Sequence, residues 1–92
     1  MSVLSDEEIG SRLRDRRGWE RSGDAIVRVV ETADFAGSVE LVNRIAPVAE
    51  EMNHHPDLVI SWNRVTVSLS THSRGGLTES DFALAERIDE LA

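Results

Sequence analysis

The sequence predicts an α+β domain in which a four-stranded antiparallel sheet carries helices packed on one face. Two segments rich in β-branched residues each contain a short turn, which is typical of β-hairpins. A long stretch with apolar residues at helical spacing separates them, and shorter amphipathic stretches stand at both ends. The predicted order is α-β-β-α-β-β-α, and residues 1–92 are expected to form a single domain.

The amino-terminal part is expected to form a helix and a hairpin. Ser5 and Glu8 have capping-box spacing, so a helix should begin at Ser5 and end near Arg17-Gly18. Residues 19–22 and 25–31 should be paired strands joined by a turn at Gly23.

The middle of the chain predicts a long helix with Asp34 as its N-cap. Pro47 should kink it, and Pro56 should end it near Asn53-His54, because the residue before a proline is biased away from helical angles. A wide apolar stripe on this helix is expected to be buried: Phe35, Val39, Val42, Ile45, Ala46, Ala49 and Met52.

The carboxyl-terminal part repeats the hairpin and helix pattern. Residues 57–62 and 64–71 are expected to pair through a tight turn at Asn63. The last helix should begin at Thr78, which has capping-box spacing to Asp81.

Composition excludes several classes of function. The formal charge of -7 argues against broad neutralisation of nucleic-acid phosphates and against docking on an anionic membrane. Because the chain has no cysteine, lysine or tyrosine, disulfides, thiolate chemistry, Schiff bases and phenolic acids are excluded. No signal peptide or membrane span is recognisable, so a cytoplasmic protein is expected.

All three histidines lie within one stretch, residues 54–72, flanked by carboxylates. Histidine is the side chain whose ordinary pKa lies nearest neutral pH, so this grouping predicts a proton-transfer site. Glu50 and His54 are four residues apart, which on a helix would bring them together and let the carboxylate orient the imidazole.

Each of these residues also has a simpler structural explanation. Glu50 and His54 could form an ordinary surface ion pair. Taken singly, His55 would be a turn residue, His72 a solvent-facing strand end and Asp81 a helix-capping acid. Trp19 and Trp62 are expected in the core more often than at a ligand.

A metal site is the main competing interpretation, since the three histidines and Glu50 could ligate zinc. Against it, adjacent side chains such as His54 and His55 usually diverge, and the H-E-x-x-H spacing is absent. The chain also has no G-x-S-x-G elbow and no glycine-rich phosphate loop.

The spacing of these residues resembles the signature of the pterin-4a-carbinolamine dehydratases. The resemblance extends from Leu4 to the end of the chain. Its motif positions are Glu50, His54, His55, Pro56, Trp62, His72 and Asp81. Framing segments that also match are Gly18-Trp19, Asp34-Phe35, Leu69-Ser70-Thr71-His72 and Gly76-Leu77-Thr78.

The resemblance implies a lyase that dehydrates 4a-hydroxytetrahydropterin to quinonoid dihydropterin, in the recycling of tetrahydrobiopterin, with no metal or redox cofactor. It also implies a homodimer or homotetramer. Since some members of the family are dimerisation partners of transcription factors, a non-catalytic dimerisation or coactivator module is the alternative.

By the same resemblance, the catalytic residues would be His54, His55, His72 and Glu50. The substrate-contacting residues would include these histidines together with Asn53, Ser70, Thr71, Ser73, Trp19 and Asp81. His54 and His72 are expected to be the acid–base pair, with His55 positioning the pterin. Asn53 stands where some members have aspartate, and Pro47 where some have another apolar residue.

Overall fold

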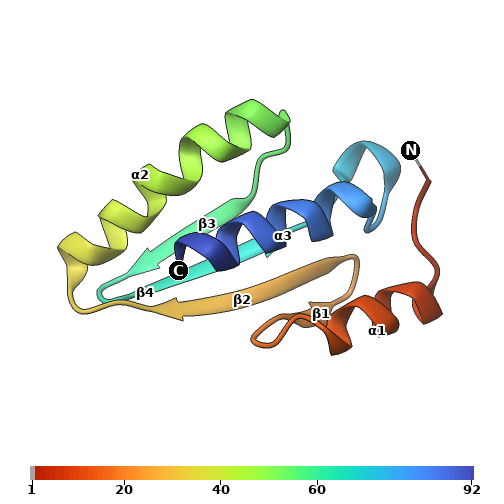
Figure 1. The fold of residues 1–92 in the computed structure, drawn as a ribbon, viewed down its shortest axis with the longest axis horizontal. Helices are drawn as coiled ribbons and strands as arrows, with labels where there is room; N and C mark the ends of the chain where they lie inside the picture. Colours follow the sequence, from red (N-terminus) through yellow and green to blue (C-terminus); the bar gives the residue numbers. More distant parts are fainter. Residues whose placement is uncertain (1) are drawn as a thin grey trace.

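A computed structural model describes residues 2–92 and has the predicted order of elements (Figure 1). The helices and strands are α1 (Asp6–Arg14), β1 (Glu20–Ser22), β2 (Ala25–Glu31), α2 (Phe35–Met52), β3 (Asp57–Ser61), β4 (Arg64–Leu69), the short 3₁₀ helix η1 (His72–Arg74) and α3 (Glu79–Leu91). The α+β class and the four-stranded antiparallel sheet are confirmed.

The sheet has the order β1-β2-β4-β3, so the two hairpins join through β2 and β4. In this central pair Ile26 lies opposite Leu69, and Val30 lies opposite Val65. Their side chains point to the same face of the sheet because strand residues two or four apart share a face. That face is the one covered by α2 and α3 (Figure 1).

The core lies between this sheet face and the two helices. Leu41 and Ile45 contribute from α2, and Leu84 and Ile88 from α3; all four are essentially inaccessible to solvent. Burying each such side chain stabilises the fold by about 1.5–3 kcal/mol relative to leaving it exposed. Within residues 2–92, no helix is long and apolar enough to cross a lipid bilayer.

The predicted buried stripe of α2 is partly wrong. Phe35, Val39 and Ala46 are exposed, whereas Leu41 and Val48 are buried. Helical periodicity gives two overlapping apolar stripes here, and packing of α2 against β3, β4 and α3 selects the one containing Leu41. The face with Phe35 and Val39 remains uncovered.

Pro47 lies inside α2 without interrupting it. Proline lacks the N–H that would donate to the carbonyl of Asn43, four residues earlier. Both residues are on the exposed side of the helix, where water can satisfy that carbonyl. The helix ends at its C-cap, Asn53, whose left-handed backbone (φ 49°) is a conformation that asparagine tolerates.

Both predicted capping boxes are confirmed. Ser5 and Glu8 exchange side-chain and backbone hydrogen bonds at the start of α1, and Thr78 and Asp81 do so at the start of α3. However, α1 ends at Arg14, earlier than expected from the sequence.

The segment containing α1 and β1 is fastened to α3 by Asp89. The Asp89 carboxylate accepts hydrogen bonds from the Trp19 indole at 2.8 Å, from Arg16 at 3.1 Å and from Arg28 on β2. Leu4 adds a backbone bond to the carbonyl of Leu77, at 2.8 Å.

Candidate active site

The three histidines gather at one end of the sheet because two antiparallel strands meet there. His54 and His55 immediately precede β3, and His72 follows β4. Asp57 at the start of β3 lies opposite Ser68 near the end of β4. The segment leading into β3 and the segment leaving β4 are therefore neighbours, and Figure 1 shows the start of α3 at this same end.

His54 forms the shortest contact at this end of the molecule. Its Nε2 lies 2.5 Å from Oδ1 of Asp81 in the first turn of α3. The Asp81 side chain is fully buried, and that of His54 is 14% exposed. The Asp81 carboxylate can only accept a hydrogen bond here, so the shared proton lies on Nε2 of His54. Nδ1 is then the nitrogen left for another partner.

The predicted Glu50–His54 pair is not what the structure contains. Glu50 instead lies 3.3 Å from Nε2 of His55, and both side chains are more than half exposed. The helical spacing rule fails because the left-handed backbone at Asn53 turns the chain before His54. His54 is thereby directed to Asp81, while His55 comes near Glu50.

His72 is the most exposed of the three histidines, with 79% of its side chain accessible. Its Nε2 lies 3.8 Å from Oδ2 of Asp57, which is close enough for attraction but long for a hydrogen bond. His72 directly follows Thr71 in the sequence, and the Thr71 hydroxyl donates to Asp81, the partner of His54. The three imidazoles thus lie at one end of the sheet but differ in how far they are buried.

Other residues expected to contact substrate have varied positions. Asn53 and Ser73 are exposed, Ser73 within η1. Ser70 donates to the backbone carbonyl of Asp24, at 2.7 Å. Trp19 is buried and bonded to Asp89, two helical turns along α3 from Asp81, so it belongs to the core rather than to the histidine cluster.

Two residues of this region were not singled out for the site from the sequence: Asp57, the partner of His72, and Thr78, whose hydroxyl lies 2.8 Å from that of Thr71. The strand register would have revealed Asp57, since it places the start of β3 beside the end of β4. Thr78 was identified only as a helix cap. Trp62, expected in the core, is 72% exposed in the turn between β3 and β4.

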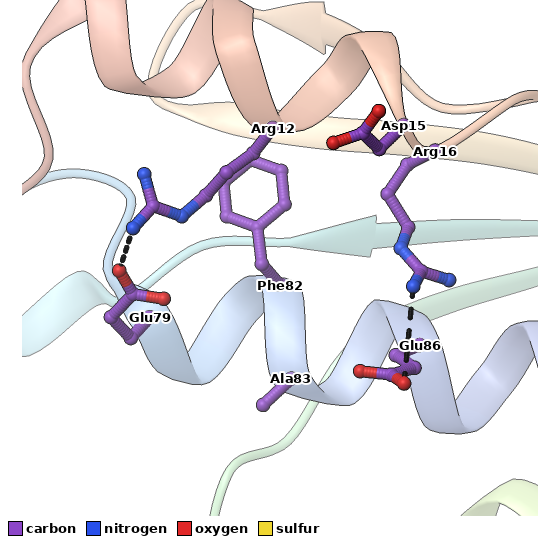
Figure 2. Close-up of a pocket in the computed structure, with 7 residues that line it drawn as sticks. All are labelled: Arg12, Asp15, Arg16, Glu79, Phe82, Ala83 and Glu86. Carbon is purple, nitrogen blue, oxygen red and sulfur yellow. Dashed lines mark hydrogen bonds and ion pairs between the residues drawn. The ribbon is translucent and has the colours of Figure 1, made fainter.

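A separate pocket of about 350 Å³ lies between α1 and α3 (Figure 2). Phe82 lines it together with two arginines that face carboxylates: Arg12 pairs with Glu79, and Arg16 lies 3.9 Å from Glu86. None of the histidines lines this pocket, and its charged groups largely satisfy one another. Over the described chain, no three histidine or acidic side chains are grouped as metal ligands would be.

Comparisons with known proteins agree with the sequence resemblance. The family model described as pterin 4 alpha carbinolamine dehydratase matches residues 2–91. A relative from Nocardia farcinica, provisionally named pterin-4-alpha-carbinolamine dehydratase, is 52% identical, covering 98% of this chain and 95% of its own. One from Thermomicrobium roseum with the same provisional name is 49% identical, covering 100% and 99%. The crystal structure of a Brucella melitensis protein named transcriptional coactivator/pterin dehydratase superposes with a TM-score of 0.95 at 33% identity, covering 99% of both chains.

Proposed function

Since this chain belongs to the pterin 4 alpha carbinolamine dehydratase family, we propose that it dehydrates a 4a-hydroxytetrahydropterin by histidine acid–base catalysis. The product would be quinonoid dihydropterin, and the physiological setting the recycling of tetrahydrobiopterin. The observation that most supports this chemistry is the 2.5 Å contact between His54 and the buried Asp81, because it holds one imidazole nitrogen inward and keeps the other for the substrate.

The reaction needs one acid and one base. The acid protonates the hydroxyl at C4a, the C4a–O bond breaks and water leaves. The N5 lone pair forms the C4a=N5 bond, and the base removes the N5 proton. A positioned group of near-neutral pKa typically contributes about 10²–10⁴-fold to each proton transfer.

The surroundings of the histidines suit different roles. His54, mostly buried and fixed by Asp81, and His72, exposed beside Asp57, form the proposed acid–base pair. His55 and Glu50 would position the pterin at the solvent-facing side. Asn53 and Ser73 are exposed near these rings and would provide polar contacts to the heterocycle.

The test is direct turnover of a synthetic 4a-hydroxytetrahydropterin by the purified chain. We expect His54→Gln and His72→Gln each to lower kcat by about 10²–10⁴-fold, because the amide cannot titrate. Glu20→Gln on β1, an exposed charge change, is the control and should behave as wild type. Absence of turnover by wild type would remove the proposed function, whereas full activity in both folded histidine variants would remove only the assigned roles.

A second function, as a homo-oligomeric interaction module, is favoured by the exposed apolar residues Phe35, Val39 and Trp62. The Brucella melitensis protein carries the words transcriptional coactivator in its name. In this alternative the chain self-associates and binds a protein partner without turning over a pterin. Turnover in the assay above, together with failure to capture a partner, would decide for the enzyme.

A further inference from the structure

The buried Asp81 carboxylate accepts hydrogen bonds from three neighbouring residues. Its Oδ1 accepts from His54, while its Oδ2 accepts from the backbone N–H of Thr78 at 2.9 Å and from the hydroxyl of Thr71 at 2.8 Å. One side chain therefore closes the cap of α3 and holds a histidine of the proposed active site. A buried carboxylate with this many partners is fixed in one orientation.

The hydroxyl protons of this cluster can be arranged in only one order. Thr71 has a single hydroxyl proton, and it is donated to Asp81. The 2.8 Å contact between the Thr71 and Thr78 hydroxyls must then be a donation from Thr78. The Thr78 oxygen in turn accepts the backbone N–H of Ser80. The donations run in one direction, from the start of α3 through Thr71 to the carboxylate.

Thr71 itself is held in place by the backbone. It pairs with Gly76 across an isolated bridge, and its N–H donates to the Gly76 carbonyl at 3.1 Å. Its side chain is nearly buried, with the hydroxyl directed to Asp81 and Thr78 rather than outward. A direct contact with a pterin, as the sequence resemblance implies, is therefore not the role that this geometry favours.

We propose that Thr71 is a positioning residue for His54 that acts through Asp81: its hydroxyl fixes the carboxylate, and the carboxylate holds the His54 ring with Nε2–H inward and Nδ1 available to substrate. This rests on the proposed function of His54 as a proton-transfer group. It predicts that a residue without contact to substrate controls kcat.

The experiment compares Thr71→Val, which has nearly the same shape but no donor, with Thr71→Ser, which keeps the hydroxyl. Thr66→Val is the matched control, since Thr66 lies on β4 on the face away from the helices. We expect Thr71→Val to lower kcat by about ten-fold or more with KM changed by less than about two-fold, and Thr71→Ser to recover most of the loss. Nitrogen NMR should show one His54 tautomer, with a protected Nε2 proton, in wild type and Thr71→Ser but not in Thr71→Val.

Wild-type kcat and an unchanged His54 tautomer in Thr71→Val would overturn the proposal. So would a raised KM at constant kcat, because it would make Thr71 a substrate contact. The NMR comparison requires no pterin, so it decides the effect of Thr71 on His54 even if the wild-type chain proves inactive. Should Thr71→Val fail to fold, Thr71→Cys, with a weaker donor, is expected to show the same changes in smaller degree.

Discussion

Asp81 and Glu50 each lie within reach of a histidine Nε2, but their surroundings differ greatly. The Asp81 side chain is fully buried and has three partners, whereas that of Glu50 is largely exposed and has one. Hydrogen bonds to a buried charged group contribute more than exposed ion pairs, which water and salt screen. The two acids should therefore respond very differently to loss of charge.

Asp81→Asn should lower the free energy of unfolding by about 1–3 kcal/mol, because the amide nitrogen cannot accept the bonds that one carboxylate oxygen accepted. Glu50→Gln should change it by less than about 0.5 kcal/mol. Urea denaturation of both variants measures the difference. Equal effects would contradict the view that Asp81 is the structural centre of the site.

Individual site residues were predictable only where a local signal existed. The grouping of the histidines is visible in the sequence, and the Thr78–Asp81 capping box fixed the place of Asp81 at a helix start. The partner of His54 was not predictable from spacing, because one left-handed residue, Asn53, redirects the chain. The Asp57–His72 contact depends on strand register, which local spacing does not reveal.

Among the elements, α2 carries the least favourable residue in its interior, Pro47. A proline inside a helix costs about 3 kcal/mol relative to alanine in an exposed position. Pro47→Ala should therefore stabilise the protein by about 1–3 kcal/mol, less if neighbouring backbone has adapted to the proline. Chemical denaturation tests this, with Ala46→Gly in the same helix expected to destabilise by about 1 kcal/mol. A loss of stability in Pro47→Ala would show that the proline is needed for the shape of α2.

The start of α1 should depend on pH. The pKa of Glu8 is lowered chiefly by the backbone N–H of Ser5, then by the Ser5 hydroxyl, with a smaller contribution from Arg12. Because the folded state lowers this pKa, the capping box is complete above the ordinary glutamate pKa and is lost as pH falls through the lowered value. The wild type should therefore lose stability on acidification more steeply than Glu8→Gln.

Urea midpoints measured at several pH values between neutral and strongly acidic provide the test. Glu7→Gln is the matched control, since Glu7 is an exposed acid in the same helical turn. It should follow the wild-type curve. Parallel curves for wild type and Glu8→Gln would contradict the role of Glu8.

The helix starts were predicted best, because N-capping residues can be recognised from the local sequence, as at Ser5, Asp34 and Thr78. The buried face of α2 was predicted worst. Both of its apolar stripes satisfy the same helical period, so only packing against the sheet and α3 distinguishes Leu41 from Val39.

At the scale of the whole molecule, one apolar surface remains uncovered. Phe35 and Val39 on α2 and Trp62 in the β3–β4 turn are exposed. The Ser38 hydroxyl donates to the Trp62 carbonyl at 2.8 Å, which places the β3–β4 turn beside the start of α2. Trp62 also has a positive φ of 49°, which is unfavourable for a bulky side chain. An exposed tryptophan in a strained turn is consistent with the proposed homo-oligomer.

Trp62→Asn should weaken self-association by about 30-fold or more, the effect of losing an interface hot spot. It should not destabilise the monomer, because asparagine accepts left-handed angles and little burial is lost. Light scattering over a concentration series tests this, with the exposed Val29→Thr on β2 as control. Unchanged association in Trp62→Asn would exclude this surface as the interface.

The bonds at Asp89 have a consequence for motion. Its three donors, Arg16, Trp19 and Arg28, are 73, 70 and 61 residues away in sequence. Detaching the amino-terminal segment breaks the bonds of Arg16 and Trp19 to Asp89, the Leu4–Leu77 backbone bond and the β1–β2 pairing, but it leaves the β2–β4 pairing intact. Opening β2 and β4 disrupts the centre of the sheet. Amide protons of α1 and β1 should accordingly exchange with solvent by a shared local opening at lower free energy than global unfolding, and Asp89→Asn should accelerate that exchange selectively.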